Sequence, residues 1–337
     1  MKLTQALIFA AIFGCTLPRT ASADWKCGLY PNEDAEQQGD TAGDTSTTAT
    51  TMAVHDGDDS VRRLQTPGKW DRAHDYASDR AEIIKLANTM DFKSWPSKRN
   101  WLDDSMSFCE WECICCEKHA EGNRLTEIHI ERNLLSGAFT DTFVRMDKLK
   151  VINFHLNNVT NIPPGIEALT DLREFKFGRN PVSGDAGTVL APFANLTKLV
   201  KFNCNFCAIT GQFPDIFANK AATLAESFWD GNALTGTLPP SLGALKVLTK
   251  LSFNINSLTG PVPESLCAAT AKATDCRIGS DTAYPPYAPF APYGKDKYPW
   301  SLPVKGNLFS CPVPSCILDG ACNSKHANPV ASPVKCK

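Results

Sequence analysis

The stretch "LTKLSFNINSLTG", residues 248–260, recurs in modified form along the chain and decides the fold. Five earlier segments share its pattern, and they begin at Leu125, Leu149, Leu172, Leu199 and Leu224. Successive starts are 24, 23, 27, 25 and 24 residues apart. A nearly constant step between similar segments indicates one structural unit stacked many times, because each unit buries its apolar face only against its neighbours. We therefore predict six stacked units over residues 125–266.

The shared pattern reads LxxLxLxxNxLxGx[LI]P, with the residue that opens each segment as position 1. Apolar residues at positions 4 and 6 alternate with outward ones, which predicts a short strand with one buried face. Asparagine at position 9 can bond buried backbone groups, and glycine at position 13 with proline at position 16 favours tight, extended chain. This is the leucine-rich repeat pattern. It predicts an α/β solenoid, a short right-handed horseshoe with a parallel sheet on its concave face, few helices and cysteine-rich caps.

The second half of the repeat, seen in "LTGTLPPSLGAL" (234–245), resembles the plant-type leucine-rich repeat of secreted polygalacturonase inhibitors and receptor-kinase ectodomains. Residues 71–124 carry an expected amphipathic helix, tryptophans and "CEWECICC" (109–116). They resemble the N-terminal cap of that family, with a spacing closer to protist caps than to those of land plants. The resemblance implies a bridge between Cys109 and Cys116. Cys113 replaces a glycine of the family pattern and Cys115 is additional, so the other pairings in this cap stay open.

The N-terminal region indicates export. Residues 1–23 combine a basic start, the apolar run "ALIFAAIFGC" and a small-residue cleavage site, which is typical of a secretory signal peptide. The run is too short to span a bilayer, which needs about 20 residues. Residues 24–70 are acidic and threonine-rich, so we expect a disordered spacer. The sequence "VRRLQ" (61–65) can be read as a processing site or as resembling the RxLR element of oomycete effectors.

Charge and cysteine content narrow the classes of partner. Cleavage after residue 23 leaves 314 residues with a formal charge of −4 and no basic stripe, so nucleic acid is not expected as a partner. No later segment is apolar for long enough to span a bilayer, so no membrane span is expected. Thirteen cysteines remain, an odd number for an oxidising compartment in which thiols normally pair. We expect an extracellular monomer, with a disulfide-linked oligomer as the alternative.

Residues 267–337 form the expected C-terminal cap and tail, which is rich in proline, aromatic residues and cysteine. Cys267 and Cys276 are predicted to pair with each other. The remaining cysteines are expected to hold the tail over the last repeat: Cys311, Cys316, Cys322 and Cys336.

One CxxC motif, "CNFC" at 204–207, would indicate a redox or metal site in another context. Its register in the fourth repeat places Cys204 at the inward position 6 and Cys207 at position 9. We therefore expect two buried, unreactive thiols.

The chain has no GxSxG, HExxH or phosphate-binding loop, and neither a catalytic site nor a metal site is expected. Function is expected on the concave face, whose outward positions 3, 5, 7 and 8 differ between repeats. Four apolar residues there are predicted to be exposed and to anchor a partner: Leu156, Phe206, Phe228 and Ile255. Polar residues complete the predicted binding surface: His129, His155, Arg132, Lys176, Arg179 and Asp230.

These observations predict a secreted, non-enzymatic recognition module without a cofactor, which binds an extracellular protein, peptide or glycan on its concave face. The resemblance to polygalacturonase inhibitors suggests inhibition of a secreted hydrolase. The alternatives are a structural glycoprotein of a cell wall or matrix, held by its odd cysteine, and a secreted effector. Asn158 and Asn195 open two N-glycosylation sequons and are expected at the surface.

Overall fold

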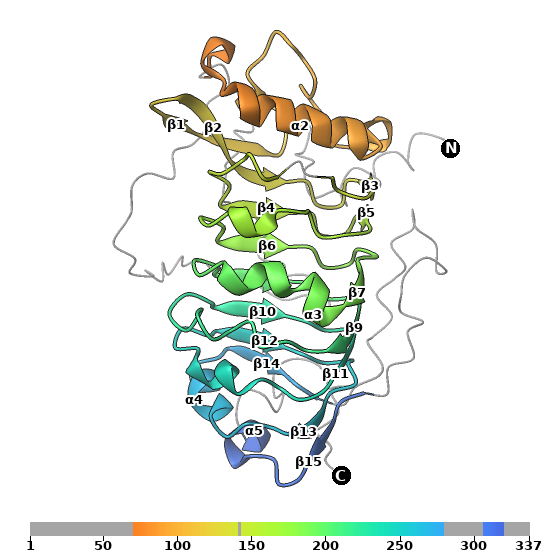
Figure 1. Cartoon of the computed structure of the whole chain (residues 1–337), viewed down its shortest axis with the longest axis vertical. Helices are drawn as coiled ribbons and strands as arrows, with labels where there is room; N and C mark the ends of the chain where they lie inside the picture. Colours follow the sequence, from red (N-terminus) through yellow and green to blue (C-terminus); the bar gives the residue numbers. More distant parts are fainter. Residues whose placement is uncertain (1–69, 141–142, 280–305, 320–337) are drawn as a thin grey trace, which may run out of the picture.

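The computed structural model describes residues 70–140, 143–279 and 306–319 (Figure 1). The expected signal peptide, spacer residues 24–69 and the "VRRLQ" sequence lie outside these residues. Cys322 and Cys336 lie outside them as well.

Short strands form one sheet that runs the length of the molecule (Figure 1). In spatial order they are β1 (Ile114–His119), β2 (Gly122–His129), β4 (Val151–Asn153), β6 (Glu174–Lys176), β8 (Lys201–Asn203), β10 (Glu226–Phe228), β12 (Lys250–Ser252) and β14 (Asp275–Arg277). β1 and β2 are antiparallel, whereas all later neighbours are parallel. The predicted parallel sheet of a leucine-rich repeat solenoid is confirmed.

The parallel strands are in register, so position 4 of each repeat lies beside position 4 of the next. Ile152, Phe175 and Phe202 therefore form one buried row, in which the ring centroids of the two phenylalanines are 5.7 Å apart. In the fifth repeat this row contains Ser227, next to the bulky Trp229. The Trp229 indole N–H donates to Ser227 Oγ at 2.7 Å, so the serine leaves room for the ring and also satisfies its polar group.

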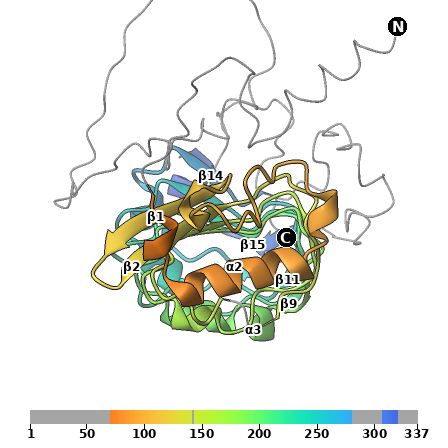
Figure 2. The same ribbon diagram turned by 90° about the horizontal axis from the view of Figure 1, so that it is seen from above.

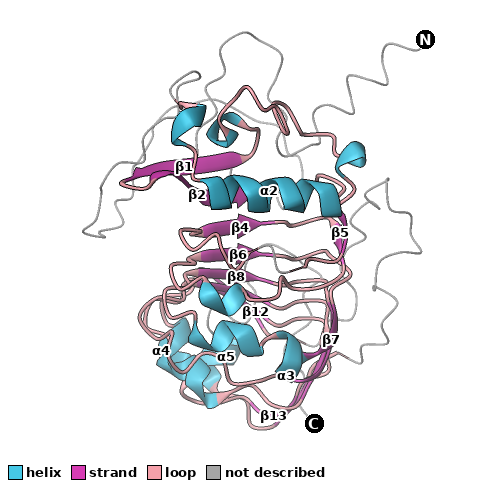
Figure 3. Cartoon of the chain, turned by 45° about the horizontal axis from the view of Figure 1, so that its top comes forward, coloured by secondary structure: helices cyan, strands magenta, loops and turns pink. Residues whose placement is uncertain are grey.

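A second row of short strands and a set of short helices complete the turns of the solenoid (Figure 3). The outer strands pair in three parallel groups: β3 (Ser136–Gly137) with β5 (Asn158–Val159); β7 (Ser183–Asp185), β9 (Ala208–Gln212) and β11 (Ala233–Thr235); and β13 (Thr259–Pro261) with β15 (Leu308–Ser310). The helical segments are η5 (Ile166–Ala168), α3 (Ala186–Val189), η6 (Ala191–Asn195), η7 (Pro240–Ala244), α4 (Leu266–Thr270) and α5 (Ser315–Asp319).

Buried asparagines at position 9 connect neighbouring repeats. Asn157 donates from Nδ2 to the carbonyl oxygens of Ile130 and Phe154, and its Oδ1 accepts from the backbone N–H of Leu135. The same role is taken by Asn180, Asn232 and Asn256. Cys207 occupies this position in the fourth repeat and has no amide to offer. The series of asparagine hydrogen bonds between repeats is therefore interrupted at the fourth repeat.

The repeat geometry continues into a seventh, split repeat that a fixed spacing does not reveal. β14 adds a parallel strand beyond the six predicted ones, and β15 extends the outer row. Asn307 supplies the position-9 amide, because its Nδ2 donates to Phe253 O and its Oδ1 accepts from the Leu258 N–H. The preceding Gly306 has a φ of 76°, matching the left-handed position 8 of earlier repeats. Residues 280–305 separate the two halves of this repeat in the sequence.

Helix α2 (Ala77–Thr89) lies over the N-terminal end of the stack, with the short segments η2 (Arg72–His74), η3 (Phe92–Ser94) and η4 (Phe108–Glu110) in the same cap (Figure 2). Asp79, in the first turn of α2, is fully buried. Its carboxylate accepts from Arg124 Nε at 2.8 Å and from the Leu125 N–H at 2.9 Å. Arg124 Cζ in turn lies 4.0 Å from the Tyr76 ring centroid. This buried pair attaches the cap helix to the first strands of the sheet.

The disulfides confirm one prediction and correct another. The Cys109–Cys116 bridge is present, with the two Cα atoms 5.6 Å apart. At the other end, Cys267 pairs with Cys316, so the predicted Cys267–Cys276 bridge is wrong. Cys267 belongs to α4, which packs against η7 and bridges to α5, whereas Cys276 belongs to β14 of the main sheet. Two cysteines that are near in sequence are thus placed on different elements. Cys276 and Cys311 each take part in a disulfide bond as well.

Candidate functional site on the concave face

The structure corrects the expected exposure of the apolar residues at position 8. Leu156, Phe206 and Ile255 are 6%, 5% and 7% exposed. Each has a left-handed backbone, with φ of 56°, 49° and 55°. Position 8 therefore lies beyond the end of the strand, where inward and outward side chains no longer alternate, and the outward direction predicted for it is not kept. The prediction that these three side chains form an exposed patch is wrong.

Phe206 shows how a position-8 side chain is covered. A Cβ on Gly231, at position 8 of the next repeat, would come within 2.1 Å of the Phe206 ring, so the ring uses the space that the missing side chain leaves. On the other side, the guanidinium carbon of Arg179 lies 5.3 Å from the ring centroid. Phe206 therefore ties three consecutive repeats together.

His129 and Glu127 form an anchored pair at the N-terminal end of the concave sheet. His129 is only 5% exposed, contrary to the solvent-facing position expected, and its Nε2 lies 2.8 Å from Glu127 Oε2. Cys115 contributes a third potential metal ligand within 4.8 Å of both. Because Cys115 is disulfide-bonded, it has no thiolate to offer, and the group does not form a metal site.

His155 is surrounded by cations. Burial lowers its pKa well below the ordinary value, and the nearby charges of Arg179, Arg132 and Lys176 lower it further. These three basic residues are half-buried on the first and third repeats, on either side of the repeat that carries His155. Arg132 and Arg179 have interactions of their own, so the feature is a positive local potential around a neutral imidazole. Such a potential favours an anionic or hydrogen-bonding partner.

One residue from each complete repeat forms the position-7 row: Glu131, His155, Gly178, Asn205, Asp230 and Asn254. Within the described residues, three members of this row have a buried polar atom without a hydrogen-bond partner: Nδ1 of His155, Oδ1 of Asn205 and Oδ1 of Asn254. These atoms occur on every second repeat. Buried polar groups in native proteins are nearly always bonded, so three such atoms in one row call for an explanation.

Two further members shape the position-7 row. A Cβ on Gly178 would come within 2.0 Å of Asn205 Oδ1, so this glycine makes room for the asparagine side chain. Asp230 accepts hydrogen bonds from Ser252 Oγ and, at 2.9 Å, from the Asn254 N–H. Burial raises the pKa of Asp230 to about 6. The row is therefore polar and partly buried, and its Asp230 end becomes neutral as the pH falls below about 6.

The remaining predicted residues keep an outward position. Lys176 and Phe228 both occupy position 5 and are half-buried on the sheet. Asn205 and Asn254 were not singled out from the sequence as binding residues. Their only available signal is their position 7, since nothing in the sequence distinguishes them from the chain's other asparagines.

The two sequon asparagines differ in their surroundings. Asn195 is exposed at the end of η6. Asn158 is half-buried in β5 and donates from Nδ2 to Ser136 Oγ at 2.9 Å. A glycan at Asn158 would therefore have to fit on a nitrogen that already donates a hydrogen bond in a half-buried site, whereas Asn195 is exposed.

Cys204 and Cys207 are fully buried free thiols whose sulfur atoms lie 3.3 Å apart. The hydrogen bond with Cys207 and burial raise the pKa of Cys204 well above its ordinary value. A buried protonated thiol is a poor nucleophile, which is consistent with a structural role.

No helix in the described part of the chain has the length and apolar character required to cross a bilayer.

No protein-family model matches the chain. A stretch of 175 residues is 25% identical to phytosulfokine receptor 1 of Arabidopsis thaliana, covering 51% of this chain and 17% of the receptor. The ectodomain of the receptor kinase GASSHO1/SCHENGEN3 from Arabidopsis thaliana, solved with CASPARIAN STRIP INTEGRITY FACTOR 2, aligns with a TM-score of 0.55 and 19% identity over 70% of this chain and 25% of its own. A plant ice-binding protein aligns with a TM-score of 0.53 and 22% identity, over 61% of this chain and 63% of its own. These similarities show a plant-type leucine-rich repeat fold.

Proposed function

We propose that this protein is a secreted, non-enzymatic recognition module that binds an extended peptide segment on its concave face. The observation that carries the proposal is the position-7 row, with its three buried and unsatisfied polar atoms. A peptide backbone or side chain that crosses the row would supply the missing partners once these side chains turn toward it, because the three atoms are buried in the unliganded protein. The GASSHO1/SCHENGEN3 ectodomain, which has a similar fold, was solved in complex with CASPARIAN STRIP INTEGRITY FACTOR 2, so this fold can present a surface to such a partner.

The dimensions of the row fit an extended peptide. Parallel strands lie about 4.8 Å apart, so His155, Asn205 and Asn254, on alternate repeats, span roughly 20 Å. An extended chain rises about 3.3 Å per residue, so about six residues would reach from the first to the last of these groups. Hydrogen bonds to polar side chains, rather than to a sheet edge, would fix such a peptide.

Charge gives the bound peptide a direction. The positive potential around His155 favours an acidic side chain or a terminal carboxylate over the first three repeats. At the other end of the row, Asp230 and Asn254 offer a hydrogen-bonding surface that becomes neutral as the pH falls below about 6. The more specific role, inhibition of a secreted hydrolase, would require that the peptide segment belong to such an enzyme.

The proposal is tested by selecting from a library of random twelve-residue peptides on the immobilised protein. Selected peptides should lose at least about tenfold in affinity when His155, Asn205 and Asn254 are all replaced by alanine, because three hydrogen bonds at about 0.5–1.5 kcal/mol each are removed. The matched control is Thr235→Ala, an exposed residue of the outer row. Failure to select any peptide, or equal binding to the triple variant, would refute the proposal.

A further inference from the structure

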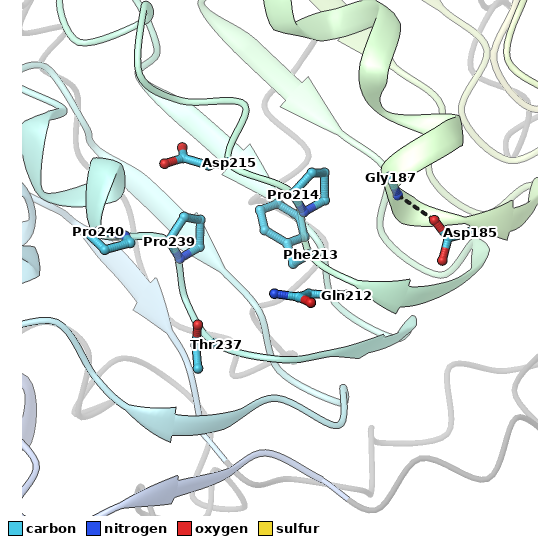
Figure 4. A pocket seen from close by; sticks show the side chains of 9 residues that line it. All are labelled: Asp185, Gly187, Gln212, Phe213, Pro214, Asp215, Thr237, Pro239 and Pro240. Carbon is cyan, nitrogen blue, oxygen red and sulfur yellow. Dashed lines mark hydrogen bonds between the residues drawn. The ribbon is translucent and has the colours of Figure 1, made fainter.

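A second candidate site lies on the outer row of strands, apart from the concave sheet. A hollow of about 420 Å³ is formed by the outer halves of the third, fourth and fifth repeats (Figure 4). This volume is in the range of pockets that hold small ligands or a few residues of a peptide. The position-7 row does not contribute to it.

The pocket exists because the third repeat departs from the pattern. The fourth and fifth repeats continue after their position-13 glycine as extended chain, "GQFP" (211–214) and "GTLP" (236–239). The third repeat instead continues as "GDAG" (184–187) and forms α3, which packs against β9. The helix stands on one side of the hollow, and the prolines of the next two repeats stand on the other (Figure 4).

Asp185 is held at the α3 side of the pocket. Its Oδ1 accepts from the Gly187 N–H at 2.9 Å, which caps the helix. Its Oδ2 lies against Gly211, where a Cβ would come within 2.1 Å of it. Since Gly211 also has a φ of +83°, the backbone and the lack of a side chain both favour glycine there. The carboxylate position is therefore determined by the local backbone.

Asp215 supplies a second carboxylate on the proline side. Its Oδ1 accepts from Ser241 Oγ. No hydrogen bond or ion pair within the described residues involves the Oδ2 of Asp215 or of Asp185, and both side chains are exposed. Figure 4 shows the two carboxylates on either side of Pro214 and Phe213. The pocket thus combines two uncompensated negative charges with apolar proline rings.

We propose that this pocket binds a basic peptide segment of a partner protein, with arginine side chains as the preferred group. An arginine buries its methylene stem against apolar surface while its guanidinium pairs with a carboxylate, and the proline rings and the free Oδ2 atoms offer these two contacts. An anionic ligand would be repelled by both aspartates. A wholly apolar ligand would remove both carboxylates from water and offer them no hydrogen bond or opposite charge in return, which is unfavourable.

The test uses the peptide Ac-Arg-Gly-Arg-NH₂ and its citrulline counterpart, which has the same shape without the charge. Binding to the full chain is followed by NMR titration. The arginine peptide should bind weakly, more weakly still as salt increases, and the citrulline peptide should not bind. The variant Asp185→Asn with Asp215→Asn should weaken binding at least about fourfold, as expected for two partly exposed ion pairs. Asparagine retains an oxygen for the Gly187 and Ser241 hydrogen bonds, so the fold should be kept, which a thermal melt checks.

The matched control is Glu167→Gln, which removes a carboxylate that is also exposed but lies outside the pocket. It should leave the affinity unchanged. Equal binding of the citrulline peptide, or an equal loss with Glu167→Gln, would overturn the proposal, because binding would then depend on shape alone or on overall charge. The triple alanine variant of the position-7 row should still bind the arginine peptide, so this site and the concave site can fail independently.

Discussion

Replacement of Asp79 by alanine should destabilise the N-terminal cap strongly. Arg124, which it pairs with, has a side chain that is only 3% exposed. Asp79→Ala removes the acceptor for Arg124 Nε at 2.8 Å and for the Leu125 N–H at 2.9 Å, and it leaves a buried guanidinium with fewer partners. Breaking a buried pair by removing one partner costs about 3–5 kcal/mol. For a domain of this size, that corresponds to a fall in Tm of about 6–20 °C.

Urea unfolding followed by tryptophan fluorescence measures this effect, because Trp95, Trp101 and Trp111 cluster in the same cap with ring centroids 5.1 and 5.2 Å apart. Asp147→Ala is the matched control, since Asp147 binds the same arginine through a side chain that is 52% exposed. It should cost less than about 1 kcal/mol. A loss below about 1 kcal/mol for Asp79→Ala, or equal losses for the two variants, would refute the claim that the buried pair holds the cap to the sheet.

Other predictions concern the repeats. Phe206→Asp should lower the free energy of unfolding by at least about 2 kcal/mol, because the ring is buried; a loss of binding with unchanged stability would contradict this. Cys207→Asn should raise the free energy of unfolding by about 1 kcal/mol, because it restores the missing position-9 amide, and urea titration would measure this. Asp230 has its pKa raised to about 6 from 3.8, so the folded state binds more protons between these values and stability should fall as pH rises through this window. Asp230→Asn should remove that slope, and an unchanged slope would exclude Asp230 as its source. Cys204 and Cys207 should react with a thiol reagent only after unfolding, and rapid reaction of the folded protein would show that they are accessible.

Much of the fold could be predicted because the repeat constrains each position locally. A leucine every 23 to 27 residues, with inward residues at positions 4 and 6, places Ile152, Phe175 and Phe202 in one row without knowledge of the rest of the chain. The split seventh repeat escaped prediction because Asn307 is separated from its strand by residues 280–305. Only its hydrogen bonds to Phe253 and Leu258 identify Asn307 as one of the position-9 residues that connect neighbouring repeats.

The candidate sites could be predicted less well, because exposure depends on neighbours as well as on position. The repeat pattern predicts that Phe206 faces outward, but a left-handed backbone and the empty space over Gly231 bury it. The disulfide partner of Cys267 could not be predicted either, because Cys316 lies 49 residues away in the sequence. Contacts of this kind are made between repeats, and the composition of one repeat does not determine them.

The sequence by itself determined the solenoid, the order of its inward residues and the buried state of Cys204 and Cys207, because periodicity decides which side chains face the core. Only the tertiary structure decided the position-7 row, the pocket between Asp185 and Asp215, and the covering of Phe206. The physical reason is that a repeat specifies its own turn, whereas the hydrogen bonds, vacant glycine positions and charges that form a site come from adjacent turns in space.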